Sequence, residues 1–365
     1  MSTISRISHL VGSSQYRAFA DDALKDEDSA AWVMDLDPSD RDRWIQCIKW
    51  LRLADRLAEN DVLEGHGSEL QHFQSGWQIL KVTGQVSSRN PYYGVLVSMR
   101  DCWFNNFSPG ADYLAIAAWE RYLNALATYH QQNLGIETLA EYEVMLENIA
   151  GQFFQVFPFF PHQYRQAAIA LGVVDQFYNN LRDLHEDAQQ GVCYFPAEVL
   201  KKFGIERKEI LQASCLSKPG YYEMMRFWLN EYLPTLRRRT CRLLLAQDLH
   251  PSWEIMRDWS LRRYSRIERI FRQCNFNYIQ FAQRYWQEVR CELAAPSLAA
   301  SQAHLAELNH LYQHAKLSVF LGFSPATLRA IRMLTAACPK LLEDPQNHKP
   351  CWVEESPLKE GILAS

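Results

Sequence analysis

The sequence lacks features that mark several classes of protein. It has no run of about 18 or more apolar residues, so no membrane-spanning anchor is expected. It has no net positive charge, because 42 acidic side chains outnumber 38 basic ones, and it therefore has no general attraction for nucleic acid. Its nine cysteines form no Cys-x-x-Cys pair, which argues against a zinc site and favours reduced thiols in a cytoplasmic protein.

What the sequence has is enough apolar material for a large core. Its 365 residues are 48% hydrophobic and 13% aromatic. Apolar residues recur at helical spacing through most of the chain, including two long runs at Tyr221–Gln247 and His250–Gln287, and no internal repeat interrupts them. We therefore predict an all-α protein. The expected parts are a polar N-terminal segment (1–28), a single helical domain (29–338) and a loosely ordered tail (339–365).

One stretch, Leu171 to Pro196, carries the chemistry. As a helix it places Gln176, Asn179, Asp183 and Asp187 three and four residues apart, on one stripe. The preceding residues are apolar, so the helix is expected to be buried, and carboxylates held there need compensation. Mg²⁺ prefers oxygen ligands and often also binds a substrate's phosphates, which suggests a diphosphate site. The spacing equally allows a solvated helix face linked by salt bridges.

The same stretch resembles the second acidic motif of the squalene and phytoene synthases. That motif reads Gln-x-x-Asn-x-x-Arg-Asp-x-x-Glu-Asp, and this chain matches it from Gln176 to Asp187, with Arg182 at the arginine. The resemblance implies an isoprenoid-synthase-type helical bundle around a central cavity. It also implies that Asn179, Asp183 and Asp187 hold Mg²⁺, which carries a prenyl diphosphate.

A second acidic helix of the family, Arg-x-x-Asp-Asp-x-x-Asp, has a diluted counterpart here. Arg52 and Asp55 are kept, whereas Arg56 replaces the second Asp and Glu59 the last. By the resemblance, Asp55 and Glu59 complete the metal cluster. An arginine at a ligand position opposes a metal ion, so Arg56 either alters the geometry or binds diphosphate directly. An ordinary exposed helix face is the competing interpretation.

Further site residues follow from the resemblance. Tyr264 is expected to close the reaction pocket, and Arg182 and Arg262 to contact diphosphate. Ser29 falls near a serine that contacts diphosphate, and Tyr142 fits one end of the family's pocket-floor pattern. The substrate-binding set is thus Arg52, Arg56, Arg262, Gln176, Ser29 and Tyr142, and the catalytic pair is Tyr264 and Arg182.

The implied activity is Mg²⁺-dependent, head-to-head condensation of two prenyl diphosphates, farnesyl or geranylgeranyl, to a squalene-like or phytoene-like product. NADPH enters if the product is reduced, and peripheral membrane contact can serve product release. Two alternatives stay open. Arg56 favours a non-catalytic relative, either a prenyl-lipid binder or an assembly factor, and a prenyl diphosphatase would ionise its substrate without coupling.

Overall fold

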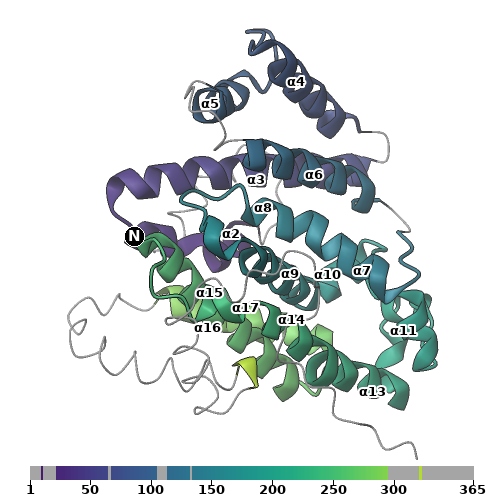
Figure 1. The fold of residues 1–365 in the computed structure, drawn as a ribbon. Helices are drawn as coiled ribbons and strands as arrows, with labels where there is room; N and C mark the ends of the chain where they lie inside the picture. The colour runs from purple at the N-terminus through teal and green to yellow at the C-terminus, as the bar shows by residue number, and fades with distance from the viewer. Residues whose placement is uncertain are drawn as a thin grey trace, which may run out of the picture. The chain divides into compact units, whose positions relative to one another are not determined.

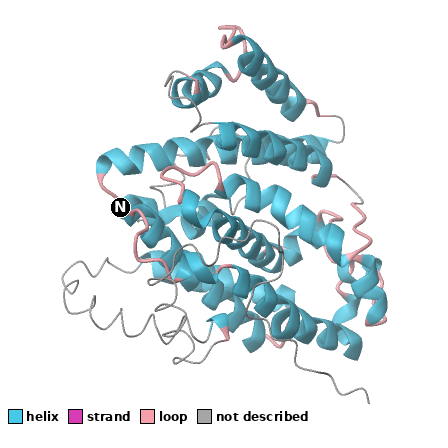
Figure 2. Ribbon diagram, viewed as in Figure 1, coloured by secondary structure: helices cyan, strands magenta, loops and turns pink. Residues whose placement is uncertain are grey.

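The computed structural model describes residue 10 and residues 22–64, 67–104, 113–131, 134–294 and 320–322, and every regular element in these ranges is a helix (Figures 1 and 2). The all-α prediction is confirmed for this part of the chain. The chain divides into two compact units, 1–307 and 308–365, and the elements below belong to the first. They are α2 (Asp22–Ala30), η2 (Ala31–Asp35), α3 (Pro38–Glu64), α4 (Glu69–Thr83), α5 (Tyr93–Trp103), α6 (Tyr113–Tyr129), α7 (Leu139–Leu146), η3 (Glu147–Gly151), α8 (Gln152–Phe154), η4 (His162–Tyr164), α9 (Arg165–Arg182), α10 (Leu184–Gln189), α11 (Ala197–Lys202), α12 (Arg207–Leu211), η5 (Ser214–Ser217), α13 (Pro219–Phe227), η6 (Trp228–Tyr232), α14 (Leu233–Arg239), α15 (Cys241–Leu244), α16 (Pro251–Gln273) and α17 (Tyr278–Ala294).

Helix α9 is the central element. Its residues are buried on nearly every side, and it packs against η3, α14, α16 and α17, so that Figure 1 shows it between α3 and α6 on one side and α14 to α17 on the other. The π-helix η3 crosses it very closely. A Cβ atom at Gly172 would lie 2.4 Å from the carbonyl oxygen of Ala150. Only glycine, which has no Cβ atom, lets the backbones of α9 and η3 come this close together.

Helix α3 lies opposite α9 and forms the other wall of the cavity described below. It begins with Pro38, whose fixed φ suits the first turn and whose missing N–H is not needed there. Its apolar side chains Trp44, Leu53 and Leu57 are buried, and it packs against α4, α6 and η2.

The N-terminal boundary differs from the sequence-based one. Residues 22–30 form helix α2, and Asp26, Glu27 and Asp28 are all buried. Arginines from other helices compensate two of these acids, since Arg56 pairs with Asp26 and Arg182 with Asp28. A polar composition therefore marks a packed helix here, and the folded domain extends further toward the N-terminus than residue 29. The predicted tail, 339–365, lies outside the described residues.

Both long helical runs predicted near the C-terminal end are interrupted. The first passes through the π-helix η6 directly before Pro234, which has no N–H to donate. The second ends at Gln273, because Asn275 and Phe276 adopt positive φ angles of 48° and 61°. The side chain of Asn277 then caps the next helix by accepting hydrogen bonds from the backbone of Ile279 and Gln280, both at 3.1 Å.

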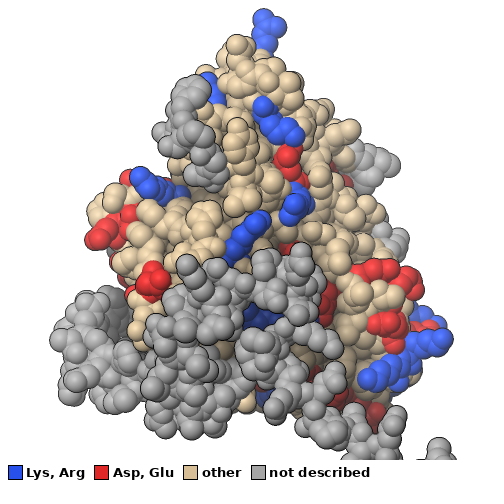
Figure 3. Space-filling model, viewed as in Figure 1, with Lys and Arg blue, Asp and Glu red and all other residues tan. Residues whose placement is uncertain are grey.

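The described helices are amphipathic or buried, and none of them is both long and apolar enough to pass through a bilayer. On the face in view in Figure 3, basic and acidic side chains are interspersed among uncharged ones. This distribution agrees with the small net charge of −4.

Candidate functional site

A cavity of about 270 Å³ lies between α3 and α9 and is closed at one side by α2 and α16. Its lining contains side chains of two kinds. The polar ones include Lys25, Ser29, Arg52, Asp55, Glu59, Gln176, Asn179, Arg182, Asp183, Glu186, Asp187, Tyr194 and Arg263, and the apolar ones include Trp32, Trp44, Ile48, Leu51, Ile149, Phe153, Phe154, Phe157 and Met256. Such a cavity suits a ligand with a charged head and a hydrocarbon chain.

The predicted stripe on α9 faces this cavity. Gln176, Asn179, Asp183 and Asp187 all line it. The helix is interrupted at Asp183, with φ −94° and ψ 0°, so the last two acids lie at the α9–α10 junction. The backbone hydrogen bonds from Asp183 to Asn179 and from Asp187 to Asp183, both 2.9 Å, preserve the helical spacing across the break.

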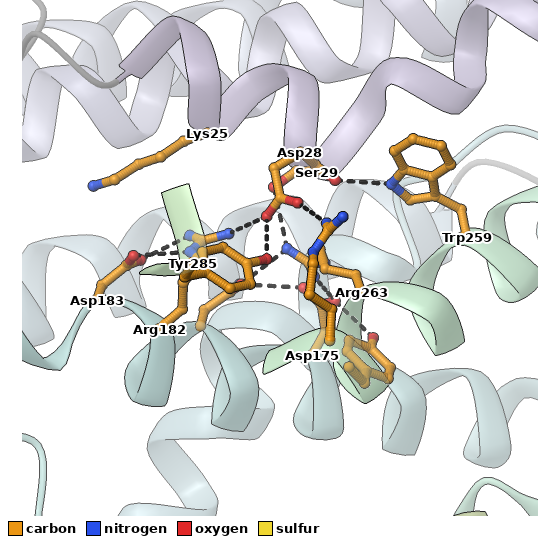
Figure 4. Close-up of polar contacts among 12 residues, drawn as sticks. Lys25, Asp28, Ser29, Asp175, Arg182, Asp183, Trp259, Arg263 and Tyr285 are labelled. Atoms are coloured by element: carbon orange, nitrogen blue, oxygen red, sulfur yellow. Dashed lines mark hydrogen bonds and ion pairs between the residues drawn. The ribbon is translucent and has the colours of Figure 1, made fainter. Parts of the chain in front are cut away.

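The two aspartates of the stripe have opposite electrostatic environments. Arg182 donates to both carboxylate oxygens of Asp183, at 2.8 and 2.7 Å (Figure 4). Burial by itself would raise the pKa of Asp183, but Arg182 and Lys25 lower it to about 2. Burial, and then the neighbouring Asp183 carboxylate, raise the pKa of Asp187 well above its ordinary value.

Asp187 is also the stripe carboxylate without a direct partner. Among the described residues, no side chain donates a hydrogen bond to it or forms an ion pair with it. A partly buried carboxylate beside another carboxylate is expected to attract a cation. Its surroundings therefore fit a divalent ion.

The opposite wall supplies two more carboxylates. Asp55 accepts a hydrogen bond from the Tyr122 hydroxyl at 3.0 Å, and Glu59 lies one helical turn further along α3. Burial and, next, the carboxylate of Asp187 raise the pKa of the Tyr194 phenol. Glu59, Asp55 and Asp183 raise it further, so carboxylates of both walls lie near one hydroxyl group.

Mg²⁺ fits this donor set only as a partly hydrated ion. Within the described ranges, no three acidic, His or Cys side chains converge tightly enough to hold a metal ion by themselves. Because Mg²⁺ commonly keeps several waters and takes one or two carboxylates together with substrate phosphates, this open arrangement is compatible with it.

The Asp183 environment gives a pH-dependent expectation. Asp183→Asn should lower the free energy of unfolding by about 2 kcal/mol at pH 7 in metal-free buffer. Because the folded pKa lies below the unfolded one, the stabilisation is complete above about pH 4 and is lost as the pH falls toward 2. Denaturant unfolding of both proteins at pH 7 and pH 3 measures this. An equal loss at both pH values would show that the carboxylate charge is not the cause.

Arg56 lies outside the cavity. It is 3% exposed, and its guanidinium donates to Asp26 of α2 at 2.9 Å. Arg52 lines the cavity and also pairs with Asp26, at 2.6 Å. The expected role of Arg56 toward diphosphate or metal therefore has no counterpart in this geometry, because a buried aspartate that sequence reasoning missed turns the side chain toward α2.

On α16, the arginine that lines the cavity is Arg263 and not the expected Arg262. Arg262 is exposed and does not line the cavity, whereas the neighbouring Arg263 is buried and does. Tyr264 is fully buried behind the wall, stacks on Tyr178 with ring centroids 4.6 Å apart, and donates a hydrogen bond to Asp175 at 2.6 Å. A helix turn of about 100° per residue explains the shift, since adjacent residues face different directions.

Two further expectations concern the wall and floor. Ser29 lines the cavity, and Tyr142 is buried below it, where its hydroxyl accepts a hydrogen bond from Asn180 at 3.2 Å. The aromatic floor comes instead from α8 and the following turn.

Lys25 and Asp175 are cavity residues that sequence reasoning missed. Lys25 reaches the cavity from α2 and donates to Glu186 at 2.8 Å. Burial would lower the pKa of Lys25, but the carboxylates of Asp183 and Glu186 raise it above its ordinary value. Asp175 directly precedes the stripe at Gln176, and an acid inside an otherwise apolar helix was the available signal.

Comparison with known proteins adds independent findings. A family model described as squalene/phytoene synthase matches residues 25–269. A 15-cis-phytoene synthase from Synechocystis sp. is 33% identical over 66 residues, which make up 18% of this chain and 19% of that protein, so the chain matches about a fifth of the relative's length. A crystal structure of a dehydrosqualene synthase in complex with a ligand is similar over 80% of this chain and 97% of its own, with a TM-score of 0.53 and 14% sequence identity. At that identity the likeness concerns the fold.

Proposed function

Because the chain belongs to the squalene/phytoene synthase family, we propose that it joins two prenyl diphosphates head to head, with Mg²⁺ and with release of diphosphate. The observation that carries the proposal is the cavity itself, which is lined by carboxylates from α3 and α9–α10 and by aromatic rings. The carboxylates suit a metal-bound diphosphate and the rings a prenyl chain.

The charged groups in the cavity suit the first step of this chemistry. Ionisation breaks the allylic C1–O bond, and the bonding electron pair leaves with the diphosphate. Lys25, Arg52 and Arg182 line the cavity, where they can bind the oxygens of the departing group. Mg²⁺, held by Asp55, Glu59, Asp183 and Asp187, would add positive charge at the same oxygens.

Aromatic side chains protect the cation that remains. Phe153, Phe157 and Trp44 line the cavity and exclude water, which would otherwise trap the cation as an alcohol. Their ring faces also attract positive charge. The allylic carbon is then free to bond to the second prenyl chain.

A non-catalytic prenyl-lipid binder is the second candidate, and one observation favours it. Arg52 and Arg182 are already paired with acids, Arg52 with Asp26 and Arg182 with Asp28 and Asp183. If these pairs persist when a ligand binds, the cavity can hold a hydrocarbon chain without activating a diphosphate. Neither the described residues nor the matched relatives indicate a nicotinamide site.

The test is incubation of the purified protein with farnesyl or geranylgeranyl diphosphate and Mg²⁺, with organic product and released pyrophosphate both measured. A coupled hydrocarbon or its cyclopropyl precursor, formed with stoichiometric pyrophosphate, is the expected result. A free prenyl alcohol with pyrophosphate would indicate a diphosphatase instead. Neither product, together with saturable binding of the prenyl diphosphate, would indicate the lipid binder.

A further inference from the structure

The amide of Asn179 lies against a buried guanidinium. Arg263 of α16 donates from Nη1 to the Asn179 side-chain oxygen at 3.1 Å and to the Ser29 hydroxyl at 3.1 Å. Its Nη2 forms an ion pair with Asp175 (Figure 4). The Asn179 amide nitrogen in turn donates to Asp175 at 3.2 Å, which fixes which end of the amide faces Arg263.

The three oxygens around Arg263 are of the kinds that a hard metal ion takes. They are one carboxylate, one amide and one hydroxyl, and they come from α9 and α2. Arg263 supplies the positive charge that Asp175 needs in a buried position, where Asp175 is 7% exposed. Moving Arg263 away would leave that carboxylate with only the neutral donors Tyr264 and Asn179 and without its cation, so the guanidinium is strongly held.

We propose that Arg263 permanently replaces one divalent cation of the site. In this chain Asn179 is then held by an arginine and does not bind metal, and divalent ions bind only at the carboxylates of Asp55, Glu59, Asp183 and Asp187. This inference rests on the proposed function, since it concerns the ions of the same site. It assigns Arg263 and Asp175 as positioning residues for the Asn179 amide.

The experiment counts bound ions without any turnover. Mn²⁺ is titrated into the full chain with and without inorganic pyrophosphate, and free Mn²⁺ is followed by electron paramagnetic resonance. Arg263→Gln is expected to bind one more Mn²⁺ per chain than the wild type, because Asp175, Asn179 and Ser29 are released. The double variant with Asp175→Asn should return to the wild-type number. Arg262→Gln, which removes the same charge from the exposed neighbouring position, should match the wild type.

An unchanged number of ions in Arg263→Gln would overturn the inference. Thermal melting checks that the Arg263 variants are folded. Asn179→Ala provides a second test that does not depend on those variants. Its Mn²⁺ affinity should stay within about twofold of the wild type, whereas a tenfold loss would identify Asn179 as a ligand and also overturn the inference. If condensation is absent and the extra ion still appears, only the proposed function fails.

Discussion

Replacing Asp187 with asparagine is expected to lower Mg²⁺-dependent turnover by about 10²- to 10³-fold, while the metal-free protein stays as stable as the wild type or becomes more stable. The loss follows because Asp187 is the carboxylate whose surroundings call for a cation. The gain follows because a like-charge contact with Asp183 is removed, and such a contact is on the order of 1 kcal/mol even when solvated. A loss of activity without a loss of stability would show that Asp187 serves as a metal ligand and not as a carboxylate that stabilises the fold.

Turnover with prenyl diphosphate and thermal melting over a range of Mg²⁺ concentrations measure these effects. The wild type should melt at a higher temperature as Mg²⁺ increases, and Asp187→Asn should lose most of that increase. Asp183→Asn is the matched control, since it changes the same group one turn earlier yet should destabilise the metal-free protein through loss of its pairing with Arg182. Wild-type turnover in Asp187→Asn would remove this residue from the mechanism.

Gly172→Ala is expected to destabilise the protein by about 3 kcal/mol. The added Cβ would meet backbone atoms of Ala150 and Gly151 at 2.4 to 2.9 Å, and backbone cannot move aside as a flexible side chain can. Because α9 carries the acidic stripe, any shift that relieves the collision also moves Asn179 and Asp183. The turnover of Gly172→Ala should therefore fall by a larger factor than the loss of folded protein alone would produce.

Gly94→Ala is the control for this substitution. Gly94 is an exposed residue in α5, and nothing lies within 4 Å of a Cβ placed there. The same change should therefore stabilise the protein, by about 0.5–1 kcal/mol, through its helix propensity. Denaturant unfolding of the two variants beside the wild type measures both effects. A Gly172→Ala protein as stable as the wild type would show that α9 and η3 have room to separate.

The sequence predicts the fold class well because helical periodicity is a local property. The stripe from Gln176 to Asp187 is likewise local, so its spacing was enough to place these side chains on one cavity wall. It is harder to predict from the sequence which of two adjacent side chains near a motif points into the cavity. Arg262 and Arg263 differ by one position, and only the packing of α16 against α9 decides that Arg263 faces the cavity.

Partners that lie far apart in the sequence were also out of reach. Nothing in the local pattern around Arg56 shows that it pairs with Asp26, 30 residues earlier, and turns away from the cavity. Asp26, Glu27 and Asp28 resemble a solvated segment for the same reason, because the arginines that pair with Asp26 and Asp28 come from other helices. Asn275 and Phe276 show a third limit, since a two-residue change in φ ended a helix whose apolar pattern continues.

The partners of Asp28 also bear on how this protein is made. Its completely buried carboxylate accepts a hydrogen bond from Tyr285, 257 residues later, and pairs with Arg266 of α16. During synthesis at the ribosome, the partners of α2 in α3 and α9 are made first, whereas Asp28 can contact Arg266 and Tyr285 only after α16 and α17 have been made. Contacts of such long range slow folding, so the surroundings of Asp28 are completed late.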